Sequence, residues 1–142
     1  LELSKAPVVA THSSLRHFTP GWERNVSDEM LIALAENGGV IQLCFGSDFV
    51  ANRKDNPDIE VSVKNVVDHI DRVRDLVGID HVGFGSVFDG EVPLPEDIND
   101  VSKFPNLIEE LLIRGYTESE IDKILNENIL RVWKEVRALA DV

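Results

Sequence analysis

Cysteine, basic residues and long apolar runs are scarce in this sequence. Its single cysteine, Cys44, excludes an internal disulfide and lies inside an apolar run, where a buried packing role is expected. No run approaches the ~18 to 20 apolar residues that a membrane-spanning helix needs. Only 14 Lys and Arg stand against 26 Asp and Glu, a formal net charge of −12. Because phosphate binding needs clustered basic residues, we expect neither a nucleic-acid partner nor a membrane span in this chain.

The chain does contain enough apolar residues for one core, with 43% hydrophobic residues among 142. Three β-rich runs, 7–12, 39–45 and 81–88, alternate with segments of helical character. This order predicts parallel βαβ units. Each run is almost continuously apolar, which predicts strands buried on both faces of a sheet.

Helix signals occupy the segments between and after these runs. Ser27 and the two acids behind it predict a capped helix. Thr117 with Glu120 forms a capping-box pattern ahead of another helical stretch. Apolar spacing and stop signals predict helices between Ser27 and Asn37 and over 63–77, 105–113 and 117–136.

Three parallel strands cannot close a barrel, and a complete (β/α)8 barrel has about 250 residues. We therefore expect an α/β fold that forms the C-terminal portion, about three βα units, of a TIM-like (β/α)8 barrel. In this interpretation 1–142 is a single partial domain whose N-terminal part is absent. The opening segment 1–5 reads as the tail of a helix, which supports it. A small open three-layer α/β sheet is the structural alternative.

Three residues are candidates for chemistry. His12 ends the first predicted strand, where an α/β barrel presents metal ligands, although a hydrogen-bonded structural histidine fits the pattern too. Arg24 lies in the following loop, where a guanidinium can hold a carboxylate by two parallel hydrogen bonds or remain solvated. Phe49, in the loop after the second strand, either lines a pocket for an apolar substrate side chain or packs the loop.

Other polar residues carry weaker signals. His17 is a second loop histidine, His69 is expected to be a packing or surface residue of a helix, and His81 opens the third strand at its amino end. Three loop aspartates lack the ligand spacing of a calcium loop and are interpreted as ordinary loop residues: Asp48, Asp55 and Asp58.

An ordered series of short blocks runs through the whole chain. The most telling are Thr11-His12-Ser13-Ser14, Arg24-Asn25-Val26-Ser27, Asp68-His69-Ile70-Asp71, Gly83-Phe84-Gly85-Ser86, Phe88-Asp89-Gly90 and Asn128-Ile129-Leu130-Arg131. Each block is ordinary alone, but together and in this order they are specific. The series resembles the C-terminal part of the membrane (renal) dipeptidase family of zinc metallopeptidases.

The resemblance implies a (β/α)8 barrel that hydrolyses dipeptides with two zinc ions, bridged by a carboxylate and a water. It makes His12 a zinc ligand and Arg24 the residue that grips the terminal carboxylate of the substrate. The family's His-x-Asp motif, bridging glutamate and other ligand histidine would precede the first residue of this sequence. The missing barrel portion is therefore an implied partner, and the isolated chain is expected to be inactive.

One position departs from the family pattern. The family reads Gly-Ser-Asp-Phe-Asp-Gly where this chain has Val87 in place of the first aspartate. In the family that carboxylate contacts the catalytic water and passes a proton to the leaving amine, a role worth about 10^2 to 10^4 in rate. Valine cannot transfer a proton, so this chain offers no catalytic acid or base at that position and a reduced rate is expected.

Three functions follow from this resemblance. The complete protein is expected to be a zinc-dependent hydrolase of dipeptides. The alternatives are a catalytically dead binding or structural subunit, which Val87 suggests, and another metal-dependent amidohydrolase. The acidic loop over 91–100 is compatible with a dimer interface, so a homo-oligomer stays open.

Overall fold

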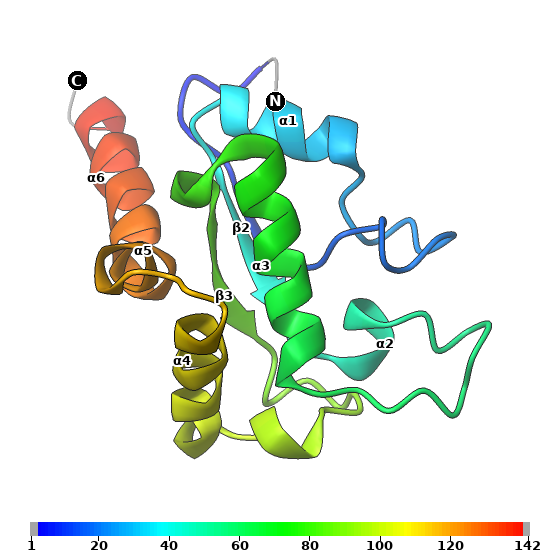
Figure 1. Ribbon diagram of the computed structural model, residues 1–142. Coiled ribbons are helices and arrows are strands. Elements are labelled where there is room, and N and C mark those ends of the chain that lie inside the picture. Colours follow the sequence, from blue (N-terminus) through cyan, green and yellow to red (C-terminus); the bar gives the residue numbers. More distant parts are fainter. Residues whose placement is uncertain (1–2, 141–142) are drawn as a thin grey trace.

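A computed structural model describes residues 3–140 of the chain (Figure 1). Its strands are β1 (Val9–Ser13), β2 (Val40–Cys44) and β3 (Val82–Ser86). They form one parallel sheet in the order β1-β2-β3, with Val9 opposite Val40 and Ile41 opposite Val82. The predicted parallel βαβ order is confirmed, and the carboxyl ends of all three strands meet at one edge of the sheet.

Helices fill the connections as predicted. The longer ones are α1 (Asp28–Glu36), α3 (Val63–Val77), α4 (Phe104–Ile113) and α6 (Asn128–Ala140). Shorter elements are α2 (Ser47–Val50), α5 (Glu118–Asp122), a π-helical stretch (Lys123–Glu127) and 3-10 turns at Ile79–His81, Glu96–Ile98 and Val101–Lys103. Figure 1 shows α3 lying across the sheet, with α1 at one end of it.

The predicted caps are present. The Ser27 hydroxyl accepts a hydrogen bond from the amide of Met30, and Thr117 and Glu120 make the reciprocal bonds of a capping box. The last helix differs from the expectation, because the π-helical stretch separates α5 from α6. Directly after that stretch, the side-chain amide of Asn128 donates hydrogen bonds to the carbonyls of Ile79 and Val82. These bonds connect α6 to the start of β3.

Burial distinguishes the three strands. Along β2, Val40, Ile41, Leu43 and Cys44 are fully buried, as expected for a central parallel strand. The expectation of two buried faces is wrong for β1, where Thr11 and His12 are exposed. In the part of the chain that the structure describes, this strand has a neighbouring strand on one side only. The helix tail expected over 1–5 is also wrong where the structure describes it, since residues 3–5 are not helical.

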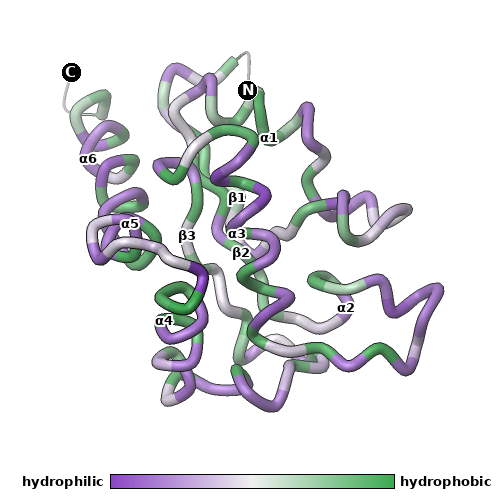
Figure 2. The backbone as a smooth tube through the Cα atoms, viewed as in Figure 1, coloured by the Kyte–Doolittle hydropathy of each residue, from purple (hydrophilic) through white to green (hydrophobic). Residues whose placement is uncertain are grey.

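Helix α6 exposes the apolar side chains of Leu130, Trp133, Val136 and Leu139. Trp133 on α6 is 64% exposed. An apolar groove of about 210 Å³ separates α6 from the free edge of β1 and is lined by Val9, Ile129, Val132, Trp133 and Val136. By contrast, Figure 2 shows the long segment between α2 and α3 as largely hydrophilic.

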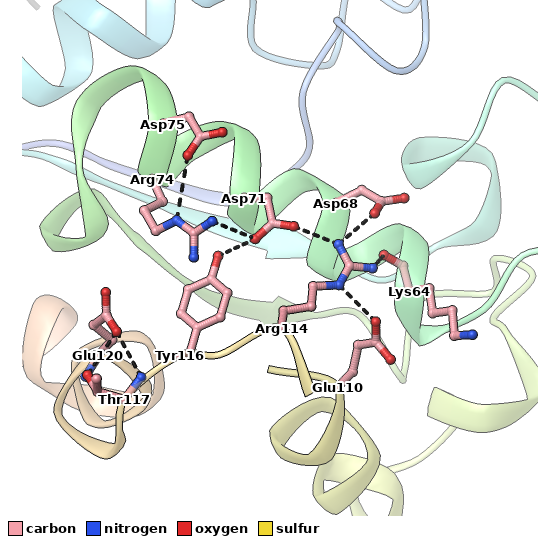
Figure 3. Close-up of polar contacts among 10 residues, drawn as sticks. All are labelled: Lys64, Asp68, Asp71, Arg74, Asp75, Glu110, Arg114, Tyr116, Thr117 and Glu120. Carbon is pink, nitrogen blue, oxygen red and sulfur yellow. Dashed lines mark hydrogen bonds and ion pairs between the residues drawn. The ribbon is translucent and has the colours of Figure 1, made fainter. Parts of the chain in front are cut away.

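A polar network joins α3 to α4 (Figure 3). The guanidinium of Arg114 lies 2.7 Å from Asp68, 2.7 Å from Asp71 and 2.8 Å from Glu110. The hydroxyl of Tyr116 donates to the other oxygen of Asp71 at 2.6 Å, and burial raises the pKa of that phenol above its ordinary value. One arginine thus holds three carboxylates from two helices behind the sheet.

Candidate active site at the carboxyl edge of the sheet

Backbone strain gathers at the carboxyl edge of the sheet. Among residues 3–140, the non-glycine residues with positive φ are His12 (49°), Ser86 (46°) and Val87 (105°). Such conformations cost of order 1 to 3 kcal/mol each, and for a β-branched valine the angle is a genuine outlier. Strain of this kind clusters at functional sites, and parallel α/β folds bind their ligands at this edge.

The three candidate residues come together there from three segments. Arg24, in the loop between β1 and α1, donates from Nη1 to the carbonyl oxygen of His12 at 2.8 Å. Its guanidinium also stacks over the ring of Phe49, 4.4 Å from the centroid, in a cation-π contact. Phe49 lies in the short helix α2 rather than in a loop, and it is only 9% exposed.

The buried side chain of Asn25 holds the Arg24 loop against α2 by hydrogen bonds, a role that the sequence analysis missed. Its side chain is 1% exposed and donates to the hydroxyl of Thr19 at 2.6 Å and to the carbonyl of Phe49 at 2.8 Å. Its amide oxygen accepts from the backbone N–H of Ser14 at 3.3 Å. The residue beside Arg24 therefore connects the end of β1 with α2. Its only sequence signal was its place in the Arg-Asn-Val block.

Trp22 extends the site, and it too was missed. Its ring packs edge-to-face against Phe49 at 5.1 Å between centroids. Trp22 also lines an open hollow of about 410 Å³, together with Asp48 and Arg53. Those two residues form an ion pair at 3.1 Å. The ring of Trp22 thus connects the Arg24 and Phe49 pair with a space large enough for a side chain.

Val87 directly follows β3 at the same edge of the sheet. Its carbonyl accepts a hydrogen bond from the amide of Gly90 at 3.0 Å, which closes a tight turn. Its side chain is half-buried and contains no ionisable group, and Asp89 two residues on is exposed. Position 87 therefore provides no acid or base at this edge of the sheet.

Comparison with known proteins supplies the family. The sequence model of the membrane dipeptidase family (peptidase family M19) matches residues 1–142. The chain belongs to the membrane dipeptidase family. The predicted resemblance is thereby confirmed.

Relatives of this dipeptidase-family chain are named dipeptidases or metallopeptidases. "Dipeptidase ataJ" of Aspergillus terreus is 45% identical over 140 residues, which are 99% of this chain and 33% of that protein. A metallopeptidase of Rhodobacter sphaeroides, crystallised with a phosphinate mimic of the dipeptide L-Ala-D-Ala, has a TM-score of 0.84 at 35% identity. That match covers 94% of this chain and 37% of the other.

A second solved structure agrees in fold. The probable dipeptidase PvdM of Pseudomonas aeruginosa has a TM-score of 0.87 at 26% identity, over 96% of this chain and 46% of that one. The chain thus spans about one third of the length of its curated relative and less than half of these structures. Despite the family's description, the helices within residues 3–140 are too short or too polar to cross a membrane.

A metallopeptidase family implies a metal, so the donor set of this chain must be tested against one. Within residues 3–140 no three His, Cys, Asp or Glu side chains gather closely enough to hold a metal ion. A zinc centre needs three or four protein ligands, and the exposed His12 would be only one of them. The described residues of this dipeptidase-family chain therefore do not form a complete metal centre, and the role of His12 as a ligand stays a prediction.

The remaining histidines make other contacts. His17 is exposed and packs edge-to-face on Phe18. His81 lies at the amino end of β3, as predicted, with Nδ1 2.8 Å from the carbonyl oxygen of Gly39. His69 is a packing residue with 0% exposure, and burial lowers its pKa to about 4.

Proposed function

We propose that this chain is the C-terminal part of a (β/α)8 dipeptidase barrel, with 1–142 as a single partial domain. Two observations support this proposal besides the share of the relatives' length that the chain covers. Within residues 3–140 the sheet has three parallel strands, and neither of its edges is paired with a further strand there. The apolar groove between β1 and α6 also fits a surface that further barrel elements cover.

The complete protein, in this proposal, is a zinc-dependent hydrolase of dipeptides. His12 would be one ligand of a centre of two zinc ions, and the other ligands would come from the missing N-terminal portion. Zinc in such a centre activates water and polarises a carbonyl. The chain alone, with one ligand, is then expected to be inactive.

The observation that carries this proposal is the meeting of Arg24, His12 and Phe49 at the carboxyl edge. The guanidinium of Arg24 donates a hydrogen bond to the carbonyl of His12, and it also lies near the thiol of Cys44, where it partly offsets the rise in pKa that burial causes. Its other N–H groups remain for an anion, and the stacked ring of Phe49 holds its plane in place. This arrangement suits a clamp for the free carboxylate of a dipeptide next to an apolar wall.

A second candidate function rests on Val87. At the place where the resemblance implies a proton-transferring aspartate, this chain has a side chain that cannot transfer protons. This favours a catalytically dead member of the family that binds ligands or partners.

The test is a hydrolysis assay of the complete, zinc-loaded protein with a dipeptide and with the same dipeptide as its C-terminal amide. We expect Arg24→Ala to raise KM for the free dipeptide about 10- to 100-fold, the usual range for a lost charged hydrogen bond. The amide should be a poor substrate of the wild-type protein and should respond little to that change. Lys64→Ala, which removes an exposed cation on α3 outside the site and outside the groove, is the matched control and should change neither KM.

Other results distinguish the proposal from its alternatives. Equal turnover of the amide, insensitive to Arg24→Ala, would favour another metal-dependent amidohydrolase. Absence of turnover in the wild-type protein and in Val87→Asp would favour the non-catalytic role. A large gain in turnover with Val87→Asp would support a weakened dipeptidase.

A further inference from the structure

His69 makes two hydrogen bonds inside the core. From α3, its Nδ1 accepts from the backbone N–H of Leu15 at 3.0 Å, and its Nε2 lies 3.1 Å from the carbonyl oxygen of Val50. A backbone N–H can only donate and a carbonyl can only accept, so the ring is neutral and its hydrogen is on Nε2. The ring of Phe18 packs against it at 4.5 Å between centroids.

The two backbone partners of His69 belong to the two segments that build the candidate site. Leu15 starts the loop that carries Arg24, and Val50 directly follows Phe49 in α2. Both are buried, with 0% and 2% exposure. A single side chain therefore joins segments that lie 54 and 19 residues away from it along the chain.

Asn25 joins the same two segments one residue earlier on each. Its side chain binds the N–H of Ser14 and the carbonyl of Phe49, whereas His69 binds the N–H of Leu15 and the carbonyl of Val50. Asn25 and His69 thus form two successive side-chain bridges between consecutive peptide groups. Asn25 belongs to one of the bridged segments, whereas His69 belongs to neither and connects both by hydrogen bonds to helix α3.

We infer that His69 is a positioning residue that holds Arg24 and Phe49 in register by fastening their two segments to α3. This inference rests on the proposed function in one respect, namely that Arg24 and Phe49 bind the substrate. Without the imidazole, the Leu15 N–H and the Val50 carbonyl lose their partners in the core and both segments must move to reach others. Small displacements of this kind reduce productive binding strongly.

The test compares two variants of the complete protein by amide hydrogen exchange. His69→Leu removes both bonds and keeps an apolar side chain of similar size. Val73→Ala, one helical turn along α3, is the matched control, since Val73 is fully buried and has no polar group. We expect His69→Leu to speed exchange at least tenfold over 13–19 and 48–51, and Val73→Ala to leave those segments within twofold of wild type.

Kinetics give the second measurement. KM for a free dipeptide should rise at least tenfold in His69→Leu and stay within twofold in Val73→Ala, even where both lose similar stability. Equal exchange and equal KM in the two variants would overturn the inference. If the wild-type protein hydrolyses no dipeptide, the proposed function fails, while the exchange data still decide on His69.

A third variant covers the case in which His69→Leu does not fold. The amide of His69→Gln reaches the position of Nε2 and keeps the bond to Val50, but it does not replace Nδ1. Faster exchange should then be confined to the segment around Leu15. Unchanged exchange there would contradict the positioning role.

Discussion

Replacing His69 by glutamine is expected to abolish a pH dependence of stability that the wild-type protein shows in weak acid. Burial of the ring, together with the nearby charge of His17, lowers the pKa of His69 from 6.5 to about 4. The hydrogen bonding acts in the same direction, since a proton on Nδ1 would face the N–H of Leu15, which is itself a donor. Glutamine does not titrate, so the difference between the two proteins isolates this one group.

The sign and size follow from proton linkage. Above pH 6.5 His69 is neutral in the folded and unfolded states, and its contribution to the free energy of unfolding is constant. Between pH 6.5 and about 4 the unfolded chain binds a proton that the folded protein excludes, so stability falls as the pH falls. At about 1.4 kcal/mol for each pH step, the loss amounts to about 3 kcal/mol.

The assay is urea unfolding of the complete protein and of its His69→Gln variant at several pH values between 8 and 4. The wild-type protein should lose about 3 kcal/mol more than the variant over this range. A difference between the two proteins that does not change with pH would refute the buried neutral imidazole. Nitrogen NMR of the His69 ring in the wild-type protein should also show the neutral form with its hydrogen on Nε2 at pH 6, with no protonated form at that pH.

Three further predictions concern the rest of the chain. Val87→Gly should relieve the strained φ of 105° and leave the free energy of unfolding unchanged or about 1 kcal/mol higher, measured by urea unfolding, because removing strain offsets the lost apolar contact. Arg114→Met should lower it by about 2 kcal/mol, less in 1 M salt, since three carboxylates lose their shared cation at a partly exposed site. Thr117→Ala should cost about 1 kcal/mol by removing the cap of α5, visible as a lower urea midpoint.

Local patterns in the sequence predicted most of the fold, because they depend on neighbours in the chain. The three strands, the helix starts at Ser27 and Thr117 and the parallel order all follow from periodicity and capping. The exposure of β1 was not predictable in this way, since it depends on the absence of a second neighbouring strand among the described residues. The π-helical stretch before Asn128 likewise carries no local signal, and that side chain bonds to residues 46 and 49 positions away.

Part of the candidate site was predictable from local sequence patterns, and part was not. His12 and Arg24 were found because they stand in recognisable blocks, and the structure brings them within hydrogen-bonding distance. Their proposed roles in metal and substrate binding remain predictions. The bridging roles of Asn25 and His69 were not predicted, because their partners are backbone groups of distant segments. No spacing in the sequence reveals such partners.

The most direct test of the central claim is native mass spectrometry of the complete protein and of its His12→Ala variant, reading assembly mass and bound zinc together. The account predicts two zinc ions for each complete barrel of the wild-type protein, at a mass well above that of this chain, and fewer in the variant. Unchanged zinc in His12→Ala, or a zinc-free wild-type protein of full mass, would contradict the claim that this chain contributes a ligand to a dipeptidase metal centre.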